Sequence, residues 1–337
     1  MRLLAWTPLL LGAVLGVQAC GSAAPNGGTP PDGSFGQDRD ADPDAKQVAT
    51  PSQPSAVLVN GLVKGVAAAD LTLTDVRICL PGANYPLPDD RAMPLANYPG
   101  VGVGQGIDLG PVSPTNGMLT VDVFNASDLQ YDATWQQQRQ TCSQITCSTG
   151  AACKKHVELQ VPVDGQAVNL LVLVDAAQGV EVRQATLDGK YSGTPGAVSV
   201  QVANFSGWHD GQEVNANFGQ TNHSGNVTPI ANPLAPSQAS TPTTTVPVPD
   251  LDYEGYGVWF TQTTGGQTAD TFGQSLGSIQ WASNPTTAPT SFYDVRKNFA
   301  LVLVGNPSDT LLMTNNRAPT FDGRALHIVA VPFEGSP

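Results

Sequence analysis

The chain has 337 residues and is strongly acidic, with a formal net charge of -13 at pH 7 and only 15 lysines and arginines. Binding to nucleic acid or to anionic lipid headgroups depends on clustered cations, so this charge argues against both as partners. Charged residues make up 13% of the chain, about half the share typical of soluble proteins, whereas glycine and proline are abundant. This balance is typical of strands and turns on an extracellular surface.

The first twenty residues have the pattern of a secretory signal peptide. Arg2 supplies the positive start, and residues 3–17 supply an apolar stretch that Pro8, Gly12 and Gly16 interrupt. A helix that spans a bilayer needs about 20 predominantly apolar residues, so this stretch is too short and too interrupted to be one. We therefore expect residues 1–20 to be removed during export.

Residues 17–20 read VQAC and resemble the lipobox of bacterial lipoproteins. The resemblance implies cleavage before Cys20 and attachment to a membrane through lipid on that thiol, each buried CH2 adding about 0.8 kcal/mol of membrane affinity. Gly21 stands where an aspartate is the usual signal for retention at the inner membrane. The resemblance therefore implies an outer-membrane lipoprotein of the cell envelope, exposed at the surface or facing the periplasm. The alternative is an ordinary signal peptide followed by an unrelated cysteine.

Residues 21–55 contain few large apolar side chains and are rich in Gly, Pro, Ser and Asp, which predicts a disordered linker. The remainder is long enough for two domains. We predict one at residues 56–193 and a second at residues 194–337. Residues 224–249 are rich in Ser, Thr and Pro and form either a long loop inside the second domain or a linker between domains.

Hydrophobic residues alternate with polar ones through much of the chain, which predicts half-buried β-strands. Two continuous apolar runs indicate strands that are covered on both faces or central in a sandwich. Helical periodicity is scarce, and the best candidate is residues 133–142. The alternating segments are residues 119–123, 157–163 and 198–202, and the continuous runs are residues 170–174 and 299–304.

The two continuous runs also indicate an internal repeat. Residues 168–175 read VNLLVLVD and residues 298–305 read NFALVLVG. Each lies late in a segment that opens with an alternating strand, at residues 75–80 and 197–202 respectively. The fold class we predict is therefore all-β, with two β-sandwich domains in tandem.

The lipobox, the linker and strands such as residues 76–78 and 170–174 resemble the immunoglobulin-like surface lipoproteins of a large family of unknown function. Residues 93–100, MPLANYPG, are similar to a recurrent segment in cell-surface lipoproteins of predatory soil bacteria. The resemblance implies immunoglobulin-like sandwiches and a place at the cell surface. It supplies no catalytic residue.

Four cysteines remain after Cys20, and an even number in an oxidising compartment predicts two disulfides. We favour a local bridge across the small, flexible residues 148–152, with the other two cysteines joined over a long loop. The alternative is a zinc site in which His156 joins the last three cysteines, but their spacing matches no zinc module. We therefore predict no metal and no cofactor. The expected pairs are Cys147 with Cys153 and Cys79 with Cys142.

One enzyme motif is present, because residues 273–277 read GQSLG and match the nucleophile elbow of serine hydrolases. Asp309 and His327 follow Ser275 in the chain order that these hydrolases use. The elbow requires a helix directly after the serine, whereas the sequence after Gly277 is typical of a strand and a turn. A secreted serine hydrolase using these three residues is thus the alternative function, and a non-enzymatic protein is the favoured one.

Aromatic residues in loops give the favoured function its candidate contact surface. Tyr85 and Tyr98 each follow Ala-Asn and precede Pro, and Trp208 and Trp259 are further candidates. The simpler alternative is that these rings pack locally. We predict a membrane-anchored surface lipoprotein that acts as a binding, adhesion or scaffold module, with a glycan or a surface protein as its partner.

Overall fold

The structure is a computed structural model in which the chain divides into two compact units, residues 1–46 and residues 47–337. All described residues belong to the second unit. The predicted signal peptide, Cys20 and residues 21–52 of the predicted linker lie outside the described residues. The structure describes residues 53–61, 75–88, 100–130, 140–145, 147, 153–176, 179–189, 199–208, 212–220, 228–244, 255–264, 267–275, 279–281, 298–305 and 326–333.

The described residues form strands in four sheets, which confirms the all-β fold class. Their helical elements are the 3-10 turns η3 (Ala126–Asp128) and η4 (Cys142–Gln144). Sheet 1 has the order β3 (Val101–Gly102), β2 (Asp75–Cys79), β5 (Met118–Asn125), β6 (Cys153–Gln160). Sheet 2 has the order β4 (Gly106–Pro111), β1 (Ser55–Asn60), β7 (Ala167–Ala176), β8 (Gly179–Asp188). Sheet 3 has the order β12 (Thr243–Thr244), β9 (Ser199–Asn204), β16 (Asn298–Val304), β17 (His327–Phe333), β15 (Gln280–Trp281). Sheet 4 has the order β11 (Thr228–Leu234), β10 (Val214–Gln220), β13 (Tyr256–Thr264), β14 (Gln267–Ser275).

The first two sheets and the last two have the same topology. In sheet 2, β1 runs parallel to β7 and antiparallel to β4, and in sheet 3, β9 runs parallel to β16 and antiparallel to β12. The internal repeat is therefore real, and its two continuous apolar runs form the equivalent strands β7 and β16. The predicted pairing of opening strands was wrong, because residues 75–80 contain β2, whereas the counterpart of β9 is β1. β1 is buried on both faces and does not alternate, so a prediction based on alternation identifies residues 75–80 as the opening strand.

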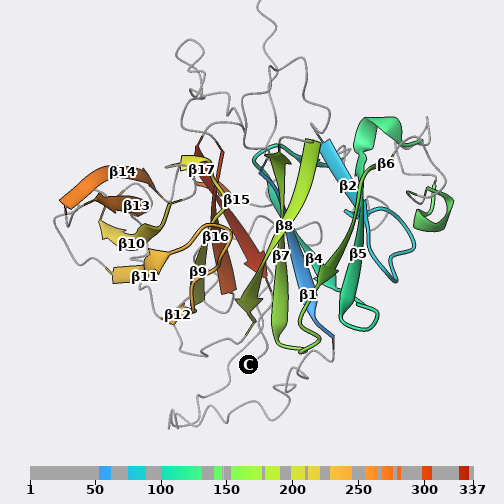
Figure 1. The fold of residues 1–337 in the computed structure, drawn as a ribbon, viewed down its shortest axis with the longest axis horizontal. Helices are drawn as coiled ribbons and strands as arrows, with labels where there is room; N and C mark the ends of the chain where they lie inside the picture. Colours follow the sequence, from blue (N-terminus) through green and yellow to red (C-terminus); the bar gives the residue numbers. More distant parts are fainter. Residues whose placement is uncertain are drawn as a thin grey trace, which may run out of the picture. The chain divides into compact units, whose positions relative to one another are not determined.

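Three hydrophobic cores separate the four sheets, which follow one another as layers from sheet 1 to sheet 4. Figure 1 shows this order, with β2, β5 and β6 at one side and β10, β11, β13 and β14 at the other. The outer two cores lie within the two sandwiches, between sheets 1 and 2 and between sheets 3 and 4. The middle core lies between sheets 2 and 3 and joins the two repeats.

This layering explains the continuous apolar runs. In β7, Leu171 packs into the first sandwich while its neighbour Leu170 packs into the middle core. In β16, Leu301 and Val302 are divided in the same way between the second sandwich and the middle core. Since both faces of each strand meet another sheet, both sets of side chains must be apolar. The prediction that these strands are covered on both faces is confirmed.

The strand at residues 198–202 was predicted to be half-buried, and this was wrong. Every residue of β9 is buried, because sheet 3 is covered by sheet 4 on one face and by sheet 2 on the other. Its polar residues Ser199 and Gln201 are therefore 1% exposed rather than solvated. By contrast, β5 and β6 alternate as predicted, with Leu119, Val121 and Val123 buried. The strand predicted to reach residue 163 ends at Gln160, however, and Val163 is 64% exposed.

Two further predictions need correction or lie outside the description. Residues 224–249 were predicted to be a loop or a linker, yet residues 228–234 form β11 and residues 243–244 form β12. Short strands at the sheet edges explain how a Pro-rich sequence can still pair, because an edge strand does not need every N–H. Of the helix predicted at residues 133–142, residues 133–139 lie outside the described residues. Cys142 begins the short turn η4.

Candidate binding site

A polar cleft lies where the two repeats meet. It has a volume of about 480 Å³, within the range of about 300–1,000 Å³ that is usual for ligand sites. Four short stretches of the chain line it. They are the segment between β6 and β7, the end of β8, strand β9 and the segment before β12. The lining residues are Pro162, Asp164, Gln166, Ala167, Thr186, Leu187, Asp188, Gln201, Ala239, Ser240, Thr241 and Pro242.

Hydrogen bonds between the two repeats fix the spacing of the walls of the cleft. The side chain of Gln201 accepts from the backbone N–H of Asp188 at 2.9 Å and donates to the backbone oxygen of the same residue at 2.8 Å. Nearby, Asn298 Nδ2 donates to the Gly189 carbonyl oxygen at 3.1 Å. Both amide side chains are buried, so these bonds are protected from water and fix the spacing of the two walls.

The other wall is also built by polar side chains that bond the backbone. Ser240 Oγ accepts from the Val202 N–H at 3.0 Å and donates to the Thr241 carbonyl oxygen at 3.0 Å. Asp164 Oδ1 accepts from the Gln166 N–H at 2.9 Å and thereby closes a tight turn at the rim. The described lining therefore carries carboxylate, hydroxyl and amide groups on rims whose backbone is fixed.

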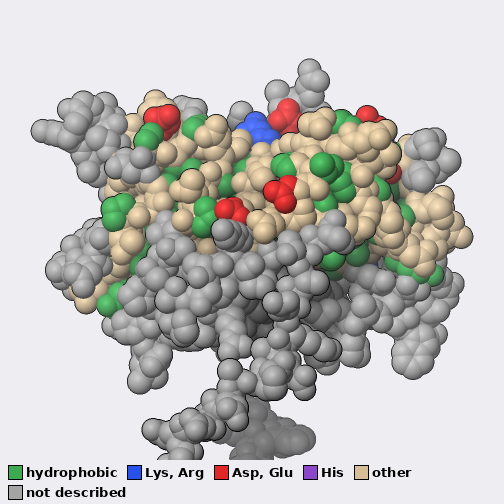
Figure 2. Space-filling model, turned by 90° about the horizontal axis from the view of Figure 1, so that it is seen from below, with side chains coloured by type: hydrophobic (Ala, Val, Ile, Leu, Met, Phe, Trp, Pro, Cys, Tyr) green, Lys and Arg blue, Asp and Glu red, His purple; other side chains and the backbone are tan. Residues whose placement is uncertain are grey.

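The cleft is negatively charged. The described residues of its lining include Asp164 and Asp188 and none of them is a lysine, arginine or histidine. Figure 2 shows the described part of one face of the molecule with several separate acidic side chains and basic side chains at one place. The potential of the cleft therefore favours a cationic ligand, in keeping with the net charge of -13. None of the lining residues that the structure describes has an aromatic ring.

Two of the four aromatic residues predicted as a contact surface are buried. Trp208 and Trp259 are only 4% and 6% exposed, and Trp208 packs edge-to-face on Phe272 with ring centroids 6.4 Å apart. Tyr85 is half-buried in the segment after β2, so it keeps part of its surface accessible. Tyr98 lies outside the described residues. The prediction was wrong for the two tryptophans. A large aromatic ring has a lower free energy when it is buried in a core than when it is exposed to water.

The residues of the alternative hydrolase site are not arranged for catalysis. His327 is completely buried in β17, and its Nε2 lies 3.2 Å from the carbonyl oxygen of Gly104 in the other repeat. Ser275 ends strand β14 and is followed by β15 at residues 280–281, where the elbow would require a helix. Asp309 lies outside the described residues. A serine hydrolase mechanism through these residues is not supported.

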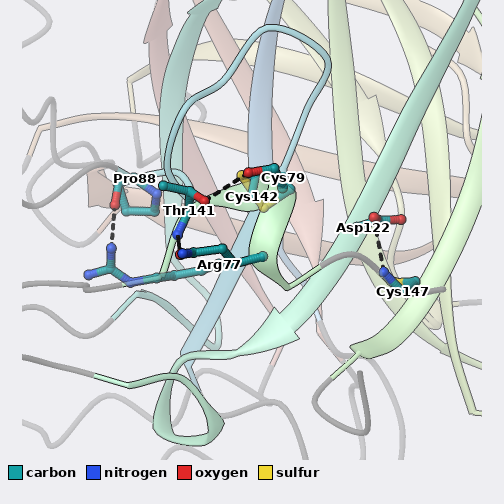
Figure 3. The surroundings of a disulfide bond; sticks show 9 residues. Arg77, Cys79, Pro88, Asp122, Thr141, Cys142 and Cys147 are labelled. Carbon is teal, nitrogen blue, oxygen red and sulfur yellow. Dashed lines mark hydrogen bonds between the residues drawn. A yellow bond between two sulfur atoms is a disulfide. The ribbon is translucent and has the colours of Figure 1, made fainter. Parts of the chain in front are cut away.

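Both predicted disulfides are present. Cys79 pairs with Cys142 with their Cα atoms 5.6 Å apart, and Cys147 pairs with Cys153 at 5.0 Å. The first bridge ties η4 to the end of β2 beside the buried side chain of Arg77, whose Nη1 donates to the Pro88 carbonyl oxygen at 2.7 Å (Figure 3). The alternative zinc site is overturned in this state, because all of its cysteines are engaged in disulfides.

Sequence reasoning missed the cleft entirely. Its lining comes from four short stretches between residues 162 and 242, and no motif or spacing connects them. The only signal in the sequence was the pair of polar residues, Ser199 and Gln201, in a strand that turned out to be buried. Buried polar side chains usually have a hydrogen-bond partner in the protein, and Gln201 bonds to the backbone of Asp188 in the other repeat.

Comparison with solved structures gives distant matches, among them two from Bacteroides species. One is named a "putative cell adhesion protein", from Bacteroides uniformis, at 8% identity and a TM-score of 0.23, covering 85% of this chain and 100% of that one. The other is named a "putative adhesin", from Bacteroides ovatus, at 11% identity and a TM-score of 0.20, covering 82% and 95%. No family model matches the chain, and no curated protein matches it either. Within the described residues, no helix is both long enough and apolar enough to cross a bilayer.

Proposed function

We propose that this protein is a membrane-anchored surface lipoprotein that acts as a non-enzymatic binding or adhesion module. The anchor is lipid on Cys20, and the chain up to residue 55 is the linker that carries the folded part beyond the headgroups. The folded part consists of two repeats, residues 56–193 and residues 194–337, which bind a partner together. The observation that carries the proposal is the polar, acidic cleft built from both repeats.

The partner we propose is a surface protein that presents lysine or arginine side chains. Asp164 and Asp188 attract such side chains electrostatically, and the hydroxyl groups of Thr186 and Thr241 accept further N–H donors. A glycan is the second candidate, but none of the described lining residues has an aromatic ring on which a sugar would stack. Nucleic acid is excluded by the same charge that favours a cationic partner.

A non-enzymatic role is supported by the state of the one catalytic motif that the sequence contains. His327 is buried and bonded to the other repeat, so it cannot take a proton from a serine that faces a substrate. We expect a broad esterase and peptidase screen of the mature chain to give no turnover that Ser275→Ala abolishes. Turnover that this substitution removes would contradict the binding role.

The binding role is tested with an array of surface peptides and glycans. The probes are the mature chain and a variant with both cleft carboxylates neutralised, Asp164→Asn with Asp188→Asn. We expect the mature chain to bind lysine- or arginine-bearing peptides and the variant to lose that binding. Neutralising Asp128 instead is a matched control, since this carboxylate pairs with Lys154 on sheet 1. Binding that survives in the cleft variant, or that is confined to glycans, would overturn the assignment of this partner to the cleft.

A further inference from the structure

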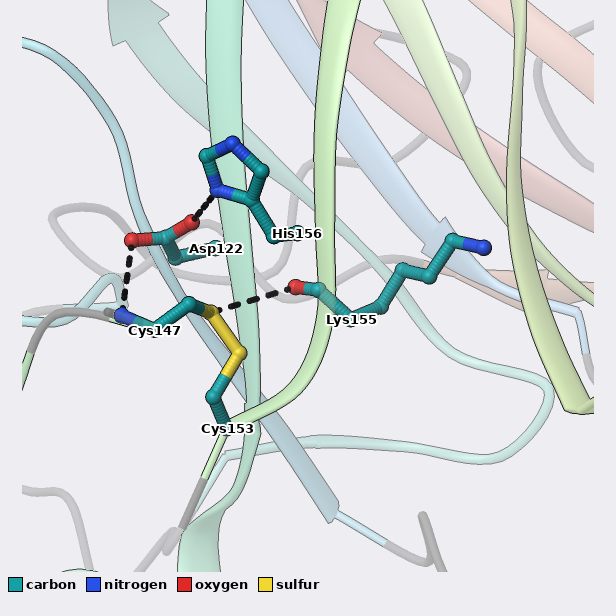
Figure 4. Close-up of polar contacts among 5 residues, drawn as sticks. All are labelled: Asp122, Cys147, Cys153, Lys155 and His156. Atoms are coloured by element: carbon teal, nitrogen blue, oxygen red, sulfur yellow. Dashed lines mark hydrogen bonds and ion pairs between the residues drawn. A yellow bond between two sulfur atoms is a disulfide. The ribbon is translucent and has the colours of Figure 1, made fainter. Parts of the chain in front are cut away.

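A group of potential metal ligands lies at the opposite end of the first repeat, on sheet 1. Among the described residues, Asp122, Cys147 and His156 have ligand atoms that all lie within 4.8 Å of one another. Cys153 lies outside this group of three, but its sulfur is joined to the sulfur of Cys147 by the disulfide. Figure 4 shows Asp122 linked to both His156 and Cys147, with Cys153 joined to Cys147 through the disulfide.

We propose that Asp122, Cys147, Cys153 and His156 form a zinc site that becomes available when the Cys147–Cys153 disulfide is reduced. Two thiolates, an imidazole and a carboxylate are a ligand set that Zn²⁺ accepts in tetrahedral sites. The cluster differs from the cysteine and histidine set considered from the sequence, because Asp122 replaces Cys142. Cys142 is held by Cys79, and no spacing in the sequence indicated that Asp122 lies opposite His156.

Two of the ligands are positioned by the sheet itself. Asp122 and His156 are directly paired across β5 and β6, and His156 Nδ1 lies 2.6 Å from Asp122 Oδ1. The other carboxylate oxygen, Oδ2, accepts from the backbone N–H of Cys147 at 3.4 Å and holds this cysteine over the pair. Ligands placed on paired strands keep their geometry more accurately than ligands on loops. Zinc bound by Nδ1 and Oδ1 takes the place of the hydrogen bond between the imidazole and the carboxylate.

The two sulfur atoms need only a local rearrangement. Zn–S bonds of about 2.3 Å in tetrahedral geometry place two sulfurs about 3.8 Å apart. Side-chain rotation can open the pair to that distance once the S–S bond is broken. In the oxidised protein, Cys147 Sγ lies 3.6 Å from the Lys155 carbonyl oxygen, on the inner side of the cluster. His156 is exposed, so the site is open to metal from solution.

A dithiol reductant gives two electrons and two protons to the Cys147–Cys153 bond, which breaks into two thiols while the reductant closes to a disulfide. Zn²⁺ then displaces the two thiol protons, and the imidazole proton moves from Nδ1 to Nε2. Oxidation reverses the sequence and releases the metal. Zinc and the disulfide thus exclude each other, and zinc favours the reduced form by mass action.

The test uses the mature chain with Cys20→Ser, so that only the four paired cysteines remain. The protein is reduced under anaerobic conditions, titrated with Zn²⁺ and treated with an alkylating reagent, and each cysteine is then mapped by mass spectrometry. We expect one zinc per reduced chain, no comparable uptake by the oxidised chain, and protection of Cys147 and Cys153 but not of Cys79 and Cys142. Equal protection of all four cysteines, or equal uptake by the oxidised protein, would overturn the site.

Variants identify the remaining ligands. We expect His156→Ala and Asp122→Ala each to weaken zinc binding by at least about tenfold in the reduced chain. Lys154→Gln is the matched control, since this residue lies on the same strand and pairs with Asp128 instead. Cobalt in place of zinc gives a thiolate-to-metal absorption band that reports the cysteine ligands directly. Unchanged affinity in the double variant of Asp122 and His156 would show that the two thiols bind metal alone and would contradict the proposal.

Discussion

Substitution of Leu170 by alanine tests whether the middle core makes the two repeats fold together. Leu170 is completely buried in β7 and packs into the core that sheets 2 and 3 share. Replacing a buried leucine by alanine removes packing and leaves a cavity, which costs about 2–5 kcal/mol in a well-packed core. Because the lost contacts include those with the second repeat, the substitution should lower the free energy of unfolding of both repeats.

Tryptophan fluorescence reports the second repeat in this experiment. Trp208, Trp259 and Trp281 all lie in that repeat, and Trp135→Phe removes the tryptophan between β5 and β6. We expect Leu170→Ala to lower the free energy of unfolding seen by these tryptophans by about 2–5 kcal/mol, although the substitution is in the first repeat. Circular dichroism should show one transition with the same midpoint.

The exposed Val163→Ala is the control, because a valine that is 64% exposed contributes little to a core, and its change should stay within about 0.5 kcal/mol. The reasoning is refuted if Leu170→Ala leaves the tryptophan transition unchanged while circular dichroism develops a second, earlier transition. That result would mean that the repeats are independently stable and that the middle core is a contact without energetic consequence.

Three further predictions concern the packing around Gly106, the two disulfides and the lipid anchor. Gly106→Ala should cost about 1–3 kcal/mol, since the new Cβ would lie 2.7 Å from Val331 Cγ2 in the other repeat, and Val331→Ala should restore part of the loss in urea unfolding. Cys142→Ala should lower the free energy of unfolding by about 4 kcal/mol and Cys147→Ala by about 2 kcal/mol. A bridge removes more entropy from the unfolded chain when it closes a longer loop, and the two pairs are 63 and 6 residues apart in sequence. The reverse order in thermal unfolding would contradict the loop-length argument. Cys20→Ala should release the protein from membranes or block its processing, and metabolic labelling with a clickable fatty acid that still marks this variant would show that another residue carries the lipid.

The strands were predictable because apolar residues lie on those faces of a strand that another layer covers. In β5 and β6, alternation with period two placed Leu119, Val121 and Val123 on the buried face, and the structure agrees. In β7 and β16, unbroken apolar runs indicated coverage on both faces. The rule failed at β9, where Ser199 and Gln201 look solvent-facing in sequence but pack between sheets. Alternation reports the polarity of a face, and not whether a second layer covers it.

The candidate site was not predictable for a related reason. The cleft arises from the way that sheet 2 meets sheet 3, and this meeting depends on contacts such as that of Gln201 with the backbone of Asp188. Neither residue type is unusual at its position in the sequence. The aromatic residues that were chosen instead, Trp208 and Trp259, stand out in sequence because they are rare and large, and for the same reason they are buried. The disulfides were predictable because loop length restricts which cysteines can meet.

The central claim is that the cleft between the repeats binds cationic side chains, and a calorimetric titration tests it most directly. The mature chain is titrated with a lysine-bearing peptide and with the same peptide acetylated on its lysines, at low and at physiological salt. We predict binding of the unmodified peptide that weakens with salt and falls at least about tenfold in the variant with Asp164→Asn and Asp188→Asn, with no binding of the acetylated peptide. Equal binding of the two peptides, or affinity that is unchanged in the variant, would contradict the account.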